Sequence, residues 1–295
     1  MALILSSQYV GRESRPLRLT ITPRQIMNYA FAVDDPNPWY LDDTRPQGIV
    51  APPMLATALT WKISANFAHY WDSAGFPAEV LARQVHYSEQ ITWYRCMVPG
   101  DQLEITGVVQ AIVPHRAGTH LIMKYTARDT TGEPVFIESI GGLLRGVRCA
   151  DEGRGDPGEF PEAASSPHET PAWERAMYID PWAPYRYDAG ADIHFPIHTS
   201  PAFARSVGLP GIIYHGAATL SLAIRDIVNR EADGDPHRLR SVACLFTAMV
   251  KPASLITLKV FRKSPDTGAT SVGFMVLNQQ QKEAVRCGCA VLAPV

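Results

Sequence analysis

The stretch GIIYHGAATLSLAIRDIV (residues 211–228) decides the fold, because a second stretch of similar design, GIVAPPMLATALTWKI (48–63), occurs in the first half of the chain. In each, Gly-Ile and a β-branched residue precede a run of helical period that contains Ala-Thr. The run at 216–228 is apolar on almost every side, so other elements must cover most of its surface. The sequence therefore predicts two halves, each built around a buried helix, near 52–66 and near 216–228.

Apolar strands follow both helices. ITWYRCMVPGDQLEITGVV (91–109) and LFTAMVKPASLITLKVF (245–261) each contain a strand that ends in Met-Val, a turn with proline, and a second strand of alternating character. Further strands joined by polar turns follow in each half, which gives a meander of about four antiparallel strands. A curled sheet that wraps a central helix buries the apolar face of both. We therefore predict an α+β protein with two hot-dog units in tandem.

A segment without apolar period separates the two halves. Residues 151–174 (DEGRGDPGEFPEAASSPHETPAWE) are rich in Gly, Pro, Ser and acidic residues, which is typical of a linker. We predict an N-terminal hot-dog unit over 1–150, this linker, and a C-terminal unit over 175–295. Fusion would pair strand edges that a single unit leaves open, so the two sheets are expected to join edge to edge as a pseudo-dimer. The remaining edges favour a homo-oligomer.

Composition argues against several functions. The 27 basic and 29 acidic residues nearly balance, and no stretch is basic enough to indicate nucleic-acid binding. No apolar run approaches the length of a membrane span, and the first residues lack the pattern of a signal peptide. The five cysteines are scattered and odd in number, which indicates free thiols in the cytoplasm. No metal-ligand cluster or phosphate-binding glycine loop is visible, so we expect no metal and no cofactor.

Three short motifs connect the sequence to a known family. DPNPWY (35–40) and PIH (196–198) match parts of the pattern Asp-x-Asn-Pro-apolar-His, and IIYHG (212–216) matches a His-Gly turn at the start of a central helix. With these motifs the chain resembles, over about 18–149 and 176–293, the MaoC-like double hot-dog family. That family comprises (R)-specific enoyl-thioester hydratases and 3-hydroxyacyl-thioester dehydratases. The first half is also similar to the FAS1-like dehydratase domain.

Neither half has the whole motif. In the first half Asp35 and Asn37 match, but Tyr40 stands where the family has histidine. In the second half His198 matches, whereas Ile193 occupies the position of the aspartate. The resemblance therefore implies a catalytic histidine in the second half and an incomplete site in the first.

The family's reaction needs a base, an acid and a place for negative charge. As water adds to Cβ of an α,β-unsaturated thioester, a histidine can take its proton, because the pKa of imidazole lies near neutral pH. The resemblance gives this role to His198. Unpaired N–H groups at the start of the second central helix would bind the thioester oxygen. Gly216 allows the substrate close to that backbone, and His215 lies next to it as a substrate-binding residue.

The acid that protonates Cα is less clear. Asp192 stands one residue before the motif position, so its side chain points to the opposite face unless the backbone near 191–193 is bulged or looped. Asp35 of the first half is a second candidate. If neither reaches His198, ordinary hydratase activity should be weak. Tyr40 cannot act as a base near neutral pH, so we expect Tyr40 and Asn37 to shape the acyl pocket of an inert first-half site.

Three functions remain open on the sequence alone. The first is a lyase that hydrates or dehydrates an acyl thioester carried on CoA or on a carrier protein, with no cofactor beyond that carrier. The second keeps the thioester pocket but catalyses conjugate addition or ring closure by the substrate's own nucleophile, isomerisation, or thioester hydrolysis. The third is a non-catalytic protein that binds acyl groups or supports an active partner chain.

Overall fold

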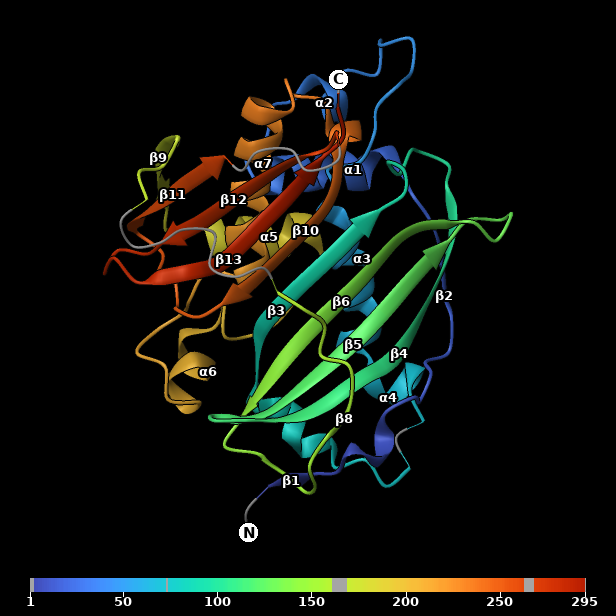
Figure 1. The fold of residues 1–295 in the computed structure, drawn as a ribbon, viewed down its shortest axis with the longest axis vertical. Helices are drawn as coiled ribbons and strands as arrows, with labels where there is room; N and C mark the ends of the chain where they lie inside the picture. Colours follow the sequence, from blue (N-terminus) through green and yellow to red (C-terminus); the bar gives the residue numbers. More distant parts are fainter. Residues whose placement is uncertain (1–2, 73, 161–168, 263–267, 295) are drawn as a thin grey trace.

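One antiparallel sheet runs through both halves of the computed structural model, which describes residues 3–72, 74–160, 169–262 and 268–294. The strand order is β2-β4-β5-β6-β3 in the first half and continues as β10-β13-β12-β11-β9 in the second (Figure 1). The strands of this path are β2 (Leu17–Thr20), β3 (Gln84–Trp93), β4 (Gln102–His115), β5 (Gly118–Arg128), β6 (Pro134–Arg145), β9 (Trp173–Ile179), β10 (Leu239–Phe246), β11 (Ser254–Arg262), β12 (Thr270–Leu277) and β13 (Glu283–Leu292).

The two halves meet where β3 pairs with β10. The pairing is antiparallel, with Ile91 opposite Val242 and Glu89 opposite Cys244. The prediction of two sheets joined edge to edge is thereby confirmed. Each strand satisfies the backbone N–H and C=O groups that the other would leave exposed at a sheet edge. This junction also brings residues of the first half's β3 close to the start of the second half's central helix.

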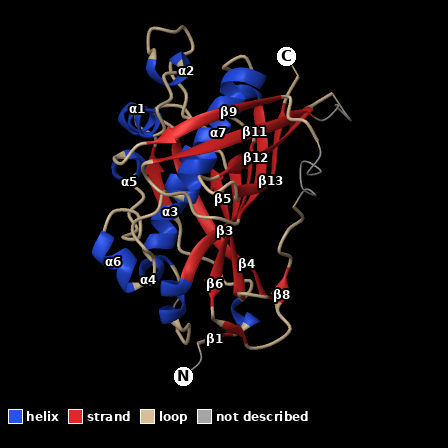
Figure 2. Ribbon diagram, turned by 90° about the vertical axis from the view of Figure 1, so that its left-hand side faces the viewer, coloured by secondary structure: helices blue, strands red, loops and turns tan. Residues whose placement is uncertain are grey.

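The helices gather on one side of the sheet (Figure 2). The two central helices are α3 (Leu55–Ala65) and α7 (Gly216–Glu231), close to the predicted positions. The other helices are α1 (Pro23–Ala32), α2 (Pro38–Leu41), α4 (Phe67–Tyr70), α5 (Ala183–Ala191) and α6 (Pro201–Ser206), with short 3₁₀ turns η1 (Ser7–Tyr9), η2 (Ala78–Arg83) and η3 (Pro236–Arg238).

Helix α7 is buried on all sides, as its sequence predicts. Every residue from Ala217 to Val228 is buried, including the polar Ser221, Arg225 and Asp226. Small residues in the first turn allow neighbouring elements to approach closely, while the buried polar side chains need partners. Arg225 has them in the first half, where Nη1 donates to the Val33 carbonyl at 2.8 Å. The helix therefore ties the halves together.

A β-bulge interrupts the pairing of β3 with β6 near the start of β3. His86 lies opposite Gly142 and Ser88 lies opposite Gly141, so Tyr87 is the extra residue. A β-carbon at Gly141 would lie 2.0 Å from Ser88 Oγ and 2.2 Å from His120 Nε2, so another residue fits there only if these side chains move. Because one residue is looped out, His86 and Glu89 come to lie on the same face.

The predicted linker, 151–174, contains ordered structure at both ends. β8 (Arg154–Gly155) pairs with β4, and β9 already begins at Trp173. Residues 161–168 lie outside the described part of the chain. Near the N-terminus, β1 (Ile4–Leu5) pairs in parallel with β7 (Arg148–Cys149), separately from the large sheet. The segment after the first unit thus folds back on that unit before the second begins.

Candidate active site

His198 lies in the loop between α5 and α6, with only 9 % of its surface exposed. Its Nδ1 is 2.8 Å from the carbonyl oxygen of Ile213. A carbonyl can only accept, so Nδ1 carries the proton and Nε2 keeps its lone pair. Burial lowers the pKa of His198 to about 4, so the ring is neutral over the physiological pH range. Nε2 is therefore available as a base.

His215 lies directly against His198 and is followed by Gly216, the first residue of α7. The His198 and His215 rings stack with their centroids 3.6 Å apart. The first intrahelical bond of α7 runs from Thr219 N to the His215 carbonyl at 3.0 Å, so the N–H groups of residues 216–218 have no partner within the helix. Such donors, with the positive end of the helix dipole, suit an oxyanion. The structure therefore brings together three of the residues that the sequence singled out.

His215 is almost fully buried, and neither of its ring nitrogens makes a well-oriented hydrogen bond within the described residues. The Ile193 backbone raises the pKa of the ring, against the larger effect of burial. Its ring packs 4.9 Å from that of Tyr187. A buried polar group without a partner destabilises the folded state. Such a group next to an oxyanion site is therefore suited to a substrate atom.

Asp192 does not join this group. The chain does leave the regular helix here, because Asp192 ends α5 in the left-handed conformation with φ 56°. Its carboxylate nevertheless turns outward, where it binds the Lys62 ammonium and lies 3.0 Å from His194 Nε2. The side chain is 58 % exposed, whereas the neighbouring Ile193 is buried. Ile193, the apolar residue at the motif position, therefore points inward, and Asp192 points to the surface.

Asp35 is far from His198. Its Oδ1 accepts a hydrogen bond from Asn229 Nδ2 at 3.2 Å. Asn229 lies in the last turn of α7, fourteen residues after His215. At 1.5 Å per residue, roughly 20 Å of helix separates the two places. The cross-half pairing of Asp35 with His198 is therefore not formed.

Asn37 and Tyr40 take part in the packing of the first half and do not face an open pocket. Asn37 caps α2 by accepting from Trp39 N at 3.0 Å, and its Nδ2 donates to the Gly234 carbonyl at 2.7 Å. Tyr40 is 1 % exposed, and burial raises its pKa well above the usual range. The cavity that it shares with Asp35 measures about 10 Å³, the lower limit for a single water molecule. This site is closed to a substrate in the structure.

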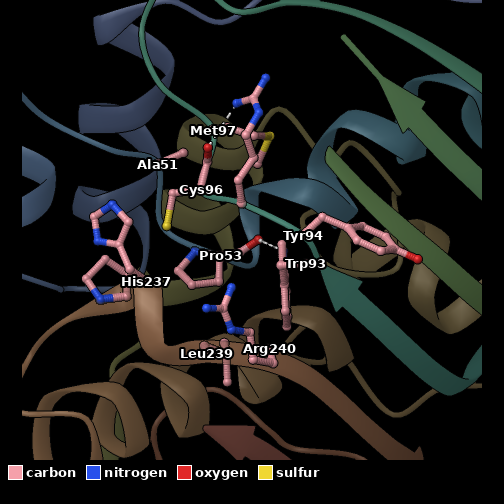
Figure 3. Close-up of a pocket in the computed structure, with 11 residues that line it drawn as sticks. Ala51, Pro53, Trp93, Tyr94, Cys96, Met97, His237, Leu239 and Arg240 are labelled. Carbon is pink, nitrogen blue, oxygen red and sulfur yellow. Dashed lines mark hydrogen bonds between the residues drawn. The ribbon is translucent and has the colours of Figure 1, made fainter. Parts of the chain in front are cut away.

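A larger cavity of about 160 Å³ opens at the start of α3 (Figure 3). It corresponds in the first half to the His215–Gly216 turn of the second. Trp93 forms one wall, and its Nε1 donates to the Pro53 carbonyl at 3.2 Å. The cavity is lined by Ala51, Pro53, Trp93, Tyr94, Arg95, Cys96, Met97, Pro236, His237, Leu239 and Arg240.

A buried polar group that no sequence motif indicates lies near the start of α7 and is formed by His86, Glu89 and Glu138. Glu89 and Glu138 are both 0 % exposed. Glu89 Oε2 lies 3.0 Å from His86 Nε2, and the charge of a protonated His86 would lower the pKa of His198. The His86 ring packs 4.3 Å from Phe246.

Two links connect this group to the helix start. A β-carbon on Gly216 would lie 3.3 Å from Phe246, which places Gly216 against the ring that covers His86. On the other side, Glu89 influences the pKa of Tyr187, whose ring contacts His215. No motif links these residues in the sequence. The one available signal was two acidic residues, Glu89 and Glu138, within strands that are otherwise apolar on their inward face.

Burial raises the pKa of both Glu89 and Glu138 well above the usual range. For Glu138, the negative charge of Glu89 acts in the same direction. Two carboxyl groups at this depth cannot both be ionised at moderate cost. At least one of the two carboxyl groups is therefore protonated in the folded protein.

Comparison with known proteins agrees with the sequence motifs. Residues 8–138 match the family model of the FAS1-like dehydratase domain region, and residues 163–283 match that of the MaoC-like domain. A probable enoyl-CoA hydratase 2 of Dictyostelium discoideum is 26 % identical over 180 residues, which are 60 % of this chain and 59 % of that protein. The chain thus spans about three fifths of the length of this relative.

Solved structures share the fold over nearly the whole chain. A MaoC-like dehydratase of Phytophthora capsici superimposes with a TM-score of 0.82 at 20 % identity, covering 96 % of this chain and 97 % of the other. A Mycobacterium tuberculosis protein described as a double hot-dog fold gives a TM-score of 0.62 at 13 % identity and covers 96 % of each chain. The predicted α+β tandem hot-dog fold is thus confirmed. The chain thus combines a FAS1-like dehydratase region with a MaoC-like domain in one double hot-dog fold.

Proposed function

We propose that the protein is a lyase that adds water to the double bond of an enoyl thioester, or removes it from a 3-hydroxyacyl thioester, with (R) stereochemistry. The observation that carries this proposal is the stacked His198–His215 pair at the unpaired N–H groups of α7. The match to the FAS1-like dehydratase and MaoC-like families, and the name of the Dictyostelium relative, support the same reaction class.

In the proposed mechanism, His198 Nε2 takes a proton from water as the oxygen attacks Cβ. The Nδ1–H bond to the Ile213 carbonyl holds the ring and stabilises its charged form during the step. The thioester oxygen, which becomes negative, lies at the N–H groups of residues 216–218. One such donor contributes about 2.7–4 kcal/mol to transition-state stabilisation in comparable sites.

The proposal also includes the carrier of the substrate, the location of the protein and its self-association. The substrate is carried on CoA or on the phosphopantetheine of a carrier protein, and the reaction uses no other cofactor. All five cysteines are free, which supports a cytoplasmic location and a reducing environment. Among the described residues, no helix has the length and apolar character needed to cross a bilayer. Self-association into a homo-oligomer remains part of the proposal.

A second candidate function is favoured by the position of the motif carboxylates. Neither Asp192, which binds Lys62, nor Asp35, which binds Asn229, is near His198. A histidine with an oxyanion site can still activate a nucleophile within the substrate. Conjugate addition or ring closure on an acyl thioester is then the alternative, and it differs from hydration in requiring no water.

The test is incubation with crotonyl-CoA and longer enoyl-CoAs, followed by the absorbance of the conjugated thioester. Loss of that absorbance with formation of the (R)-3-hydroxyacyl product is expected. Stable absorbance with every chain length, on both CoA and carrier protein, would exclude hydration. It would favour the conjugate-addition candidate.

The pH dependence of kcat/KM should report the pKa of the base. Because burial lowers the pKa of His198 to about 4, the neutral form that accepts a proton is lost only when the pH falls through about 4. Activity should therefore rise between about pH 3 and 5 and stay level up to neutral pH. Stopped-flow assays that finish before acid unfolding would measure this limb, and an acid limb near pH 6.5 would show that His198 is not the base.

Tyr40→Phe should leave turnover within a few-fold of the wild type. The tyrosine is buried beside a cavity of about 10 Å³, and its raised pKa excludes a role as base near neutral pH. Steady-state kinetics of the variant with crotonyl-CoA would measure this. A severe loss, equal to that of a His198 variant, would mean that the first-half site reacts.

A further inference from the structure

Hydration needs a proton at Cα, and the carboxylate that the motif would supply is turned away. Asp192 is bound to Lys62 on the surface. The buried group formed by His86, Glu89 and Glu138 contains carboxyl groups that a chain of contacts connects to the start of α7.

We propose that His86 and Glu89 form a proton relay that supplies the acid of the site, in place of the missing motif aspartate. In this relay Glu89 lies behind His86 and delivers its proton to Nε2, while His86 Nδ1 faces the substrate and protonates Cα. The relay rests on the proposed function and explains how it proceeds without Asp192.

The geometry of His86 suits a relay. Nε2 is fully buried and lies 3.0 Å from Glu89 Oε2. The side chain as a whole is nevertheless 20 % exposed. One nitrogen thus contacts a buried carboxyl, while part of the side chain remains accessible. In the proposed relay, Glu89 exchanges its proton through this contact.

His86 also lies at the right place for the reaction. Its ring packs 4.3 Å from Phe246, and Phe246 contacts Gly216, where the thioester oxygen is proposed to bind. His198 approaches the same helix start through its stack on His215. A thioester held there would have the base and the relay around it, as the addition of a proton and a hydroxide to neighbouring carbons requires.

The surroundings keep Glu89 protonated. It faces His86 from β3, Glu138 from β6, Tyr187 from α5 and Cys244 from β10. Burial lowers the pKa of His86 to about 4, so its ring is neutral, and none of the others is a cation. Glu89 and Glu138 contact each other, and the hydroxyl groups of Thr57 and Thr60 lie against Glu138, but burial has the larger effect on the pKa of both carboxyl groups. A carboxylate in this place would be desolvated and not paired with a cation, so the neutral acid is the stable form.

The step balances in atoms and charge. As the C–O bond forms at Cβ, His198 takes a proton from water and the π electrons move through Cα to the thioester oxygen. When the carbonyl re-forms, Cα takes the proton from His86 Nδ1, and Nε2 takes the proton of Glu89. The proton on His198 then returns through water to Nδ1, and Nε2 gives its proton back to Glu89. One water has been added and every residue is restored.

Glu89→Gln tests the relay, because it replaces a neutral acid by a neutral amide of the same shape. Its kcat should fall by about 10²–10⁴ while KM changes only a few-fold, since the loss of an acid affects the chemical step. Glu138→Gln is the matched control: the same buried change in a residue without the 3.0 Å contact to His86. It should retain kcat to within about tenfold. His86→Gln, at a partly exposed side chain, should reproduce the loss of Glu89→Gln.

Two kinetic results would overturn the relay. One is full activity of Glu89→Gln or His86→Gln. The other is an equal loss in Glu89→Gln and Glu138→Gln, which would indicate that the pair only supports the core. Thermal unfolding of each variant, measured in parallel, shows that the fold is intact.

Infrared difference spectroscopy separates failure of the relay from failure of the proposed function. The C=O stretch of a protonated carboxyl should be present in the wild type at neutral pH and reduced in Glu89→Gln, without any substrate. Turnover without this band overturns the relay and leaves the proposed function standing. The band without turnover of any enoyl thioester overturns the proposed function, and with it the relay as a device for hydration.

Discussion

Replacement of His198 by alanine should reduce turnover of an enoyl thioester by about 10²–10⁴, the usual contribution of general acid–base catalysis. The expected loss falls on kcat, because Nε2 acts in the transition state while the N–H groups of α7 still bind the thioester. The variant also loses the 2.8 Å bond to the Ile213 carbonyl and the stack on His215, so unfolding should be measured alongside.

His194→Ala is the control for this experiment. His194 belongs to the same loop, but its side chain is 67 % exposed and contacts Asp188 and Asp192 at the surface. Its removal should leave turnover within a few-fold of the wild type. Near-normal activity of His198→Ala, or a comparable loss in both histidine variants, would show that His198 is not the base.

The free energy of unfolding should be greatest near pH 6.5 and fall on both sides. On the acid side, burial lowers the pKa of His86, His120 and His198 to about 4 and that of His215 still further. The unfolded chain binds these protons near pH 6.5 but the folded chain does not. Stability due to neutral burial is therefore present above pH 6.5 and is lost as the pH falls toward 4, by about 1.4 kcal/mol per pH unit for each group.

The buried carboxyl groups have the opposite effect on the pH dependence of the free energy of unfolding. Because the pKa of Glu89 and Glu138 is raised, the unfolded chain releases these protons above about pH 4.5 while the folded chain keeps them. Two of the four histidine protons are thus offset between pH 4.5 and 6.5, so stability still falls as the pH decreases through this window, but less steeply than the four histidines alone would require. Above pH 6.5 the histidines no longer contribute, and stability should fall as the pH rises.

Urea unfolding at intervals from pH 4.5 to 9 would measure this curve. Glu89→Gln combined with Glu138→Gln should flatten the decline above pH 6.5, because an amide does not titrate, and should steepen the acid side. A stability that keeps rising from pH 6.5 to 8 in the wild type would show that the two glutamates are ionised in the folded protein.

Much of the fold could be predicted from the sequence because it depends on local patterns. The apolar run at 216–228 requires cover on all sides, and α7 (Gly216–Glu231) is buried as expected. The repeat of helix and strands predicts two similar units, and the pairing of β3 with β10 joins them as the edge argument requires. His198, His215 and Gly216 come together because the motif sets the loop and the helix start that hold them.

The acid of the site could not be predicted in this way. The sequence allowed a loop at 191–193 that would turn Asp192 inward, and a turn does occur there. Ile193 is buried in its place, because an apolar side chain gains free energy from leaving water, whereas the carboxylate is more stable beside Lys62 at the surface. Which of two neighbouring side chains points inward depends on the groups that surround each of them in the folded protein. Those groups come from distant parts of the chain and are known only from the tertiary structure.

By itself the sequence determined the two hot-dog units, their central helices and the histidine end of the site, since each depends on residues close together in the chain. Only the tertiary structure decided that Asp35 lies at the far end of α7 and that His86 and Glu89 meet near its start. Strict alternation would put His86 and Glu89 on opposite faces of β3. The bulge at Tyr87 brings them to one face, and it depends on pairing with Gly141 and Gly142 of β6, more than fifty residues away.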